Sequence, residues 1–223
     1  MSVVPQVRTA RRIRRLAGGL VVLGVLAAVW GVAYTVNAAT QAPATVRVPV
    51  AVHEAENGGW GDVRVGLDGV QVPDGWLTGA RPSGYYPSTV DSTLTLAAWG
   101  STRTEQALSR ADWLVTGLGL LAGTLLLQPV LLAVAAGEPF ARGNARLLTV
   151  LAGVVAVTGT LAPLPPALAS TLVLARTGLD ANPALSASSG ITPAPLLVAA
   201  LVLVVAVAFR AGERLARDTE GLV

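Results

Sequence analysis

The chain has 223 residues, of which 52% are hydrophobic and only 13% are charged, and its mean hydropathy is +0.60. Because about a quarter of the residues in an ordinary soluble domain are charged, this composition indicates an integral membrane protein. The net charge of only +3, with dispersed arginines, argues against direct nucleic-acid binding, and the absence of cysteine excludes disulfides and cysteine nucleophiles.

The first apolar run, residues 16–37, follows an arginine-rich N-terminus, residues 1–15. Basic residues concentrate on the cytoplasmic side of membrane spans, so we expect the N-terminus to lie in the cytoplasm. A cleaved secretory signal is the alternative, because residues 37–42 include the small residues of a cleavage site. The run is longer than the roughly 7 to 15 residues of a signal core, which favours an uncleaved anchor. The arginines are Arg8, Arg11, Arg12, Arg14 and Arg15.

Residues 38–111 are polar and rich in glycine and proline, and we expect them outside the cytoplasm. Alternating apolar residues predict half-buried strands from Val46 to Val52 and from Leu94 to Ala98. In the segment between these strands, Asp68-Gly69 predicts a hairpin turn that joins two further short strands, Val63–Leu67 and Val70–Val72. This segment is therefore a small β-rich extracytoplasmic domain. We expect the large aromatic residues of this segment to pack on the sheet or at the lipid interface, and a surface for ligand binding is the alternative. These residues are Trp60, Trp76, Tyr85, Tyr86 and Trp99.

The second span is predicted over residues 112–136 and is followed by a polar loop at residues 137–146. Gly119 and Gly123 have the spacing that lets another helix approach closely, so they are candidate helix-packing residues. Gly137 is placed to end the helix as a C-terminal cap.

The third apolar run, residues 147–175, is interrupted by Pro163, Pro165 and Pro166. Either one kinked helix spans the whole run, or the membrane helix ends near Leu164 and the remainder lies at the outer surface. The pattern favours neither. An irregular external loop, residues 176–192, follows.

The fourth span, residues 193–209, leads into a tail, residues 210–223, that carries Arg210, Arg214 and Arg217 at helical spacing. With four spans, the tail, the 137–146 loop and the N-terminus lie on the same side, which the arginines predict to be the cytoplasm. The fold class is therefore a mainly α-helical membrane protein: four transmembrane helices with the β-rich domain between the first two, in the cell membrane.

The loop Gly137-Glu138-Pro139-Phe140, with Asn144 and Arg146-Leu147 after it, and the tail that begins Phe209-Arg210-Ala211-Gly212 carry a resemblance. Together they resemble a bacterial four-span membrane-protein family catalogued only as a domain of unknown function. The resemblance extends over residues 113–223 and does not include the external segment. It implies the four-span plan, and it implies a regulatory role because such genes often neighbour a small helix-turn-helix regulator.

No catalytic, cofactor-binding or metal-binding pattern is present in the sequence. His53, the only histidine, lacks the second histidine of a helical zinc motif, and without lysine there is no phosphate-binding loop of the Walker type. The predicted spans contain no ionisable residue between their ends, which argues against a proton-coupled carrier. We therefore expect no enzyme activity and no cofactor.

We expect a regulatory or sensory protein with an extracytoplasmic binding domain and a cytoplasmic contact surface. The candidate contact residues are Phe140, Asn144, Arg146, Arg210, Arg214 and Arg217. The first alternative is an accessory subunit that packs beside another membrane protein, or an oligomer, through the Gly119/Gly123 face. The second, less favoured, is an envelope enzyme that uses the carboxylates Glu54, Glu56, Asp62 and Asp68. Expected partners are the lipid bilayer and a cytoplasmic regulator or a membrane protein.

Overall fold

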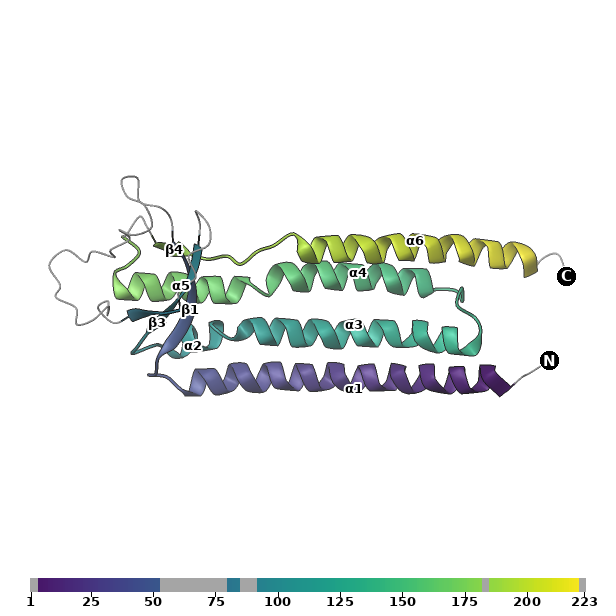
Figure 1. Ribbon diagram of the computed structural model, residues 1–223, viewed down its shortest axis with the longest axis horizontal. Helices are drawn as coiled ribbons and strands as arrows, with labels where there is room; N and C mark the ends of the chain where they lie inside the picture. Colours follow the sequence, from purple (N-terminus) through teal and green to yellow (C-terminus); the bar gives the residue numbers. More distant parts are fainter. Residues whose placement is uncertain (1–3, 53–79, 85–91, 182–184, 221–223) are drawn as a thin grey trace. The chain divides into compact units, whose positions relative to one another are not determined.

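A computed structural model describes residues 4–52, 80–84, 92–181 and 185–220, and this part of the chain is mostly helical (Figure 1). Four helical stretches are long and apolar enough to cross a membrane: Ala10–Thr40, Ala111–Ala136, Asn144–Thr177 and Ala194–Asp218. The prediction of a mainly α-helical chain with four helices long and apolar enough to cross a membrane is confirmed.

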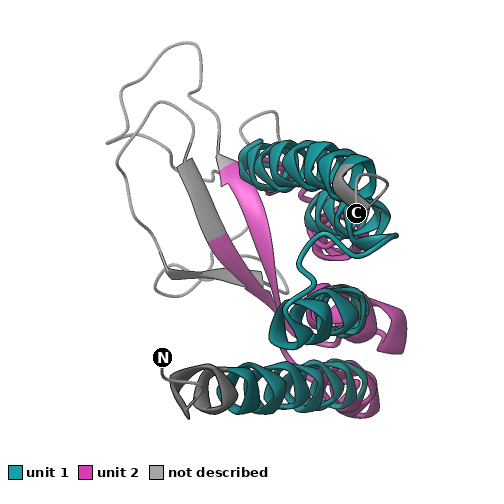
Figure 2. Cartoon of the chain, turned by 90° about the vertical axis from the view of Figure 1, so that its right-hand side faces the viewer, with its two compact units in different colours: residues 1–32, 114–161, 192–223 teal, residues 33–113, 162–191 magenta. Residues whose placement is uncertain are grey.

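The chain divides into two compact units (Figure 2). The helical unit consists of Met1–Val32, Leu114–Leu161 and Thr192–Val223. The sheet unit consists of Ala33–Trp113 and Ala162–Ile191. Each unit therefore combines segments that are far apart in the sequence.

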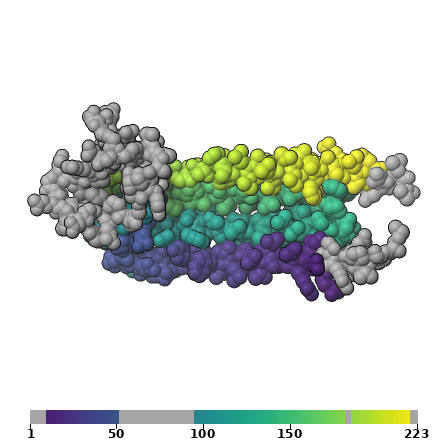
Figure 3. Space-filling model, in the orientation of Figure 1, coloured from purple at the N-terminus to yellow at the C-terminus, as the bar shows by residue number. Residues whose placement is uncertain are grey.

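The helical unit contains the first part of α1 (Val4–Thr40), most of α3 (Ala111–Ala136), α4 (Asn144–Leu161) and α6 (Ala194–Glu220). Helix α4 packs along α6, and the space-filling view shows the two in contact (Figure 3). Several boundaries differ from the predictions, and α6 continues to Glu220, through most of the predicted tail at residues 210–223. Helix α1 begins at Val4, so the predicted N-terminal segment is helical up to the span, and α4 begins at Asn144, which shortens the predicted 137–146 loop by three residues.

The sheet unit is built on a four-stranded sheet with the order β2-β3-β1-β4. Strands β1 (Val46–Val52) and β3 (Ser92–Ala98) lie where apolar alternation predicts them and pair antiparallel, with Val46 opposite Ala98. Strand β2 (Ala80–Gly84) pairs with β3 on the outer side. The Asp68-Gly69 turn and four of the predicted aromatic residues, Trp60, Trp76, Tyr85 and Tyr86, lie outside the described residues.

The fourth strand corrects the predicted origin of the sheet. Strand β4 (Leu185–Ala187) pairs antiparallel with β1 and comes from the loop predicted to be irregular at 176–192. The sheet is therefore not built from the segment between the first two spans alone. A three-residue strand is too short to show a period-2 pattern, which explains why the sequence did not reveal it.

The third apolar run is divided between α4 and α5 (Leu164–Thr177), which are separated by Ala162 and Pro163. Pro165 and Pro166 lie in the first turn of α5, where a missing N–H removes no helical hydrogen bond. Helix α5 belongs to the sheet unit and packs against β1. The helical run is therefore interrupted at Ala162 and Pro163, and its position relative to the outer surface stays a prediction.

The core of the sheet unit lies between β1, β3 and α5. One face of β1 carries the buried side chains Val46, Val48 and Val50. They pack with Leu96 of β3 and Val173 of α5. The Ser170 hydroxyl of α5 donates a hydrogen bond to the Pro49 carbonyl oxygen at 2.6 Å. Burial of the alternating valines explains why β1 could be predicted. A short helix, α2 (Arg103–Leu108), packs on α5.

Candidate functional site

The loop between α3 and α4 begins with a Schellman cap. Gly137 has a φ of 87°, and its N–H donates to the Val134 carbonyl oxygen at 3.1 Å. The next N–H, of Glu138, donates to the Ala133 carbonyl oxygen at 3.0 Å. These two bonds satisfy carbonyl groups that the helix end would leave unpaired. Glycine suits this position because other residues are strained at positive φ.

Asn144 closes the loop from the other end. Its side-chain amide Nδ2 donates to the Pro139 carbonyl oxygen at 2.9 Å, and its backbone N–H donates to the Ala141 carbonyl oxygen at 3.2 Å. Asn144 is only 4% exposed. This predicted contact residue therefore supports the loop from inside and is not part of its exposed surface.

Glu213 of α6 binds the start of α4. Its Oε1 accepts a hydrogen bond from the buried Ala145 N–H at 2.9 Å, across 68 positions of sequence. The first N–H groups of a helix have no partner within the helix, and a carboxylate there is also favoured by the helix dipole. The Arg217 Nε, one turn further along α6, donates to the Glu213 carbonyl oxygen at 3.1 Å.

Phe140 joins the loop to α6 by ring packing. Its ring lies edge-on to the ring of Phe209, with centroids 5.6 Å apart and an interplanar angle of 61°. It also covers Gly212, where an added Cβ would overlap the Phe140 ring. Phe209 packs in turn on a small core of Val130, Leu148 and Ala206, residues from three helices. We call residues 137–146 together with residues 209–217 the loop–tail face.

The predicted arginines of the loop–tail face are exposed. They are Arg146 on α4 and Arg210, Arg214 and Arg217 on α6, and the loop adds Arg142. The face therefore combines a partly exposed aromatic ring, Phe140 at 43% exposure, with several guanidinium groups. Such a surface can bind carboxylates or phosphates, but the face holds no nucleophile and no metal-binding cluster among its described residues.

The two candidate helix-packing glycines lie against α4 of the same chain. An added Cβ at Gly119 would overlap the side chain of Thr158, whereas one at Gly123 would make an ordinary contact of 3.4 Å with Leu151 Cδ1. Gly119 thus lets α3 approach α4 closely, and Gly123 contributes little to that approach.

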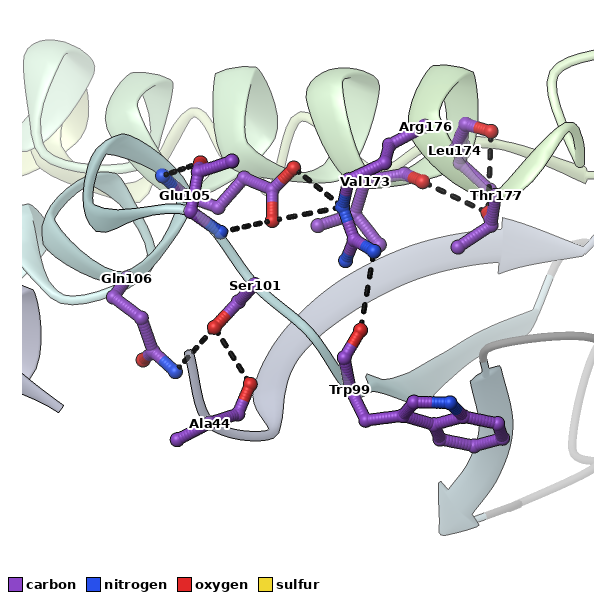
Figure 4. A network of polar contacts seen from close by, with 10 residues as sticks. Ala44, Trp99, Ser101, Glu105, Gln106, Val173, Leu174, Arg176 and Thr177 are labelled. Atoms are coloured by element: carbon purple, nitrogen blue, oxygen red, sulfur yellow. Dashed lines mark hydrogen bonds and ion pairs between the residues drawn. The ribbon is translucent and has the colours of Figure 1, made fainter. Parts of the chain in front are cut away.

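A second polar cluster lies in the sheet unit, where α2 packs on α5 (Figure 4). Thr102 and Glu105 form a capping box: the Glu105 N–H donates to Thr102 Oγ1 at 3.2 Å, and the Thr102 N–H donates to Glu105 Oε2 at 3.1 Å. The Arg176 Nε of α5 donates to both Glu105 carboxylate oxygens, at 2.8 and 3.1 Å. Glu105 is 3% exposed, so this ion pair is largely withdrawn from water on the carboxylate side.

Arg176 and Ser101 extend the same cluster to the chain segments around it. Arg176 Nη1 donates to the Trp99 carbonyl oxygen at 3.1 Å. Ser101 Oγ donates to the Ala44 carbonyl oxygen at 2.6 Å and accepts from Gln106 Nε2 at 2.9 Å. The cluster holds the connection from β3 to α2 in place and has the character of a structural network.

The carboxylates of the alternative enzyme hypothesis come from the segment between β1 and β2. Glu54, Glu56, Asp62 and Asp68 all lie outside the described residues, as does His53. The hypothesis stays untested.

Comparison of the chain with known proteins identified no related protein. The sequence matches no protein-family profile, and no curated protein and no solved structure is significantly similar to the chain.

Proposed function

We propose that this chain is a regulatory membrane protein whose loop–tail face binds an acidic surface of a cytoplasmic protein. One observation carries the proposal: the loop and the end of α6 are tied together by the Glu213–Ala145 hydrogen bond and by the packing of Phe140 on Phe209 and Gly212. Arginines from two distant segments are thereby presented from one supported surface. Without these contacts, the loop and the end of α6 would not form one continuous surface.

The distribution of arginine supports the orientation. Arginines precede the first span and also occupy the loop between the second and third spans and the end of α6. An even number of crossings separates these three segments, so they share one side, and short basic segments favour the cytoplasm. In this orientation the sheet unit carries the extracytoplasmic β-containing domain. The basic residues of the long segment between α1 and α3 count little, because long segments translocate largely regardless of charge.

The charge of the loop–tail face defines the partner. The face carries Arg142, Arg146, Arg210, Arg214 and Arg217 against two carboxylates, Glu138 and Glu213. One of the two, Glu213, already accepts a hydrogen bond from Ala145. Guanidinium groups bind carboxylates in a bidentate manner, and an aromatic ring beside them adds apolar contact area. An acidic protein surface with an apolar patch fits this combination.

The test is affinity capture from detergent-solubilised membranes with the full chain as bait. We compare wild type, an Arg210→Gln/Arg214→Gln variant, and Arg103→Gln, which removes an equally exposed arginine from α2 in the sheet unit. The expected result is a cytoplasmic protein that wild type and Arg103→Gln retain and the double variant loses. Direct binding of that protein, once purified, should weaken with added salt because the contact is ionic.

A further variant separates geometry from charge. Gly212→Ala keeps every arginine but displaces the Phe140 ring. It should weaken partner binding without changing membrane insertion. If the partner binds all variants equally, the loop–tail face is not the binding site. If the arginine variants change only retention of anionic lipid, the arginines anchor the helix ends to headgroups and the proposal is wrong.

A further inference from the structure

A pocket of about 240 Å³ lies within the sheet unit. Its walls come from the end of α1, from the start of β1 and from the corner between α2 and α3. Ligand pockets for drug-sized molecules occupy roughly 300 to 1,000 Å³, so this pocket suits a smaller group. None of the residues placed in the predicted contact surface lines it.

The charged residues that line the pocket are all positive. Arg47 of β1 and Arg110 of the corner line the pocket, and no aspartate or glutamate is among its lining residues. Neither guanidinium forms an ion pair with another residue in the described part of the chain. The nearest carboxylate along the sequence, Asp112, interacts electrostatically with Arg110 but does not line the pocket, and its buried Oδ1 has no hydrogen-bond partner among the described residues. The lining is therefore cationic.

The neutral lining residues add hydrogen-bond donors. Asn37, Gln41 and Gln106 carry amide NH₂ groups, which donate two hydrogen bonds each. Gln106 is held in place because its Nε2 donates to Ser101 Oγ at 2.9 Å. Arginine forks and amide groups together are suited to an oxygen-rich anion.

The side of the pocket that carries Arg110 is pre-arranged. The Arg110 guanidinium lies over the ring of Tyr34, with its Cζ 5.5 Å from the ring centroid. Trp113 meets the same ring edge-on at 5.8 Å, and Thr35 Oγ1 donates to the Arg110 carbonyl oxygen at 3.1 Å. Packing on an aromatic face limits the rotamers of arginine, so less freedom is lost when an anion binds.

A structural role for the arginines at the end of α1 is the main competing explanation, because cations are favoured at helix C-termini. Two of the terminal carbonyl groups already have partners. The Gln41 N–H donates to the Ala38 carbonyl oxygen at 3.1 Å, and the Thr40 hydroxyl donates to the Asn37 carbonyl oxygen at 2.8 Å. These two carbonyl groups therefore do not require the arginines as hydrogen-bond caps.

We infer that this pocket binds a phosphate group, carried either by a free anion or by a lipid headgroup. The inference goes beyond the proposed function and does not depend on it, since the pocket and the loop–tail face belong to different units. Arg47 and Arg110 bind the phosphate oxygens, and the amide side chains complete the shell.

Two probes distinguish the two sources of phosphate. Inorganic phosphate is titrated by calorimetry into the full chain, purified in phosphate-free buffer with a non-ionic detergent. Phosphatidylglycerol retention is measured by native mass spectrometry after reconstitution in mixed phosphatidylcholine and phosphatidylglycerol nanodiscs. Both use wild type, Arg47→Gln, Arg110→Gln and the control Arg103→Gln. Arg47 is the cleaner change, because it is exposed and its side chain has no hydrogen bond or ion pair among the described residues, whereas Arg110 also stacks on Tyr34.

Loss of one charge-assisted hydrogen-bond donor should weaken binding roughly tenfold or more. Phosphate binding that weakens in Arg47→Gln and Arg110→Gln but not in Arg103→Gln identifies a site for a free anion. Phosphatidylglycerol retained by wild type and Arg103→Gln but lost from Arg47→Gln identifies a headgroup site. If neither probe distinguishes Arg47→Gln from Arg103→Gln, the inference is overturned.

Discussion

The pair Glu105–Arg176 allows the sharpest test of how the sheet unit is held together (Figure 4). Replacing Glu105 with Gln keeps an oxygen that can accept the Thr102 N–H of the capping box but removes the charge that faces Arg176. Replacing it with Ala removes both. The two variants therefore separate the ion pair from the helix cap.

The expected magnitudes follow from burial. Breaking a fully buried pair costs about 3–5 kcal/mol, whereas exposed pairs contribute less than about 1 kcal/mol. The Glu105 side chain is 4% exposed and that of Arg176 is 29% exposed, so water partly compensates the arginine. We expect about 1.5 kcal/mol of local destabilisation for Glu105→Gln. Glu105→Ala should lose about 1 kcal/mol more, because the Thr102 N–H then loses its acceptor, whereas the N–H of residue 105 can still donate to Thr102 Oγ1.

Amide hydrogen exchange of α2 and α5, followed by mass spectrometry on the detergent-solubilised chain, measures these local free energies. Exchange should accelerate about tenfold in Glu105→Gln and further in Glu105→Ala, because 1.4 kcal/mol corresponds to a factor of ten. Arg103→Gln, which changes an exposed side chain on the same helix, should leave the rates unchanged. A double variant, Glu105→Gln/Arg176→Gln, should cost less than the sum of the two single variants. Strict additivity would show that the two side chains are not coupled and would refute the reasoning.

Two further predictions concern the helical unit and the topology. Gly119→Ala should lower the unfolding temperature, since its Cβ meets the stiff Thr158 side chain and overpacking costs about 1–3 kcal/mol, whereas Gly123→Ala should be nearly neutral. Thr158→Ala should rescue Gly119→Ala only in part, because it removes Oγ1 and Cγ2 but keeps the Cβ, which also lies in the overlap. Equal unfolding temperatures for both glycine variants would contradict the close approach. Because the chain has no cysteine, single cysteine replacements can report which side of the membrane a residue lies on. A membrane-impermeant maleimide should label Thr104→Cys in intact cells but label Arg142→Cys only after permeabilisation. The reverse labelling pattern would contradict the proposed orientation.

The long helices could be predicted because apolar composition alone determines where a span lies. The predicted second span, residues 112–136, differs by one residue from α3. Strand β1 was predictable for a related reason, since its alternating residues Val46, Val48 and Val50 are buried on one face. For the third apolar run, the interruption could be predicted but the packing of its second part, α5, could not. Prolines mark an interruption, but α5 leaves the helical unit because its small residues Ala169 and Ser170 fit the sheet.

The candidate site could be predicted as a list of residues but not as an arrangement. The polar loop and the arginine tail stand out because they interrupt apolar sequence. Their contact does not, because the Ala145–Glu213 hydrogen bond spans 68 positions and no local pattern encodes it. For the same reason Asn144 was expected at the surface: a polar residue in a loop looks exposed until its hydrogen-bond partner, here Pro139, is known.

Glu213 is the residue on which the unity of the loop–tail face depends most directly. Glu213→Ala leaves the buried Ala145 N–H without its partner, which costs about 1–3 kcal/mol, while Glu213→Gln can keep the hydrogen bond and loses only about 0.5–1 kcal/mol of charge–dipole interaction. Exchange at the first turn of α4 should therefore accelerate more in Glu213→Ala than in Glu213→Gln. Glu138→Ala, which removes an exposed carboxylate from the same loop, is the matched control and should have no effect. Equal acceleration in both Glu213 variants would mean that charge, and not the hydrogen bond, holds the face together. No acceleration in either would mean that Phe140 packing on Phe209 is sufficient.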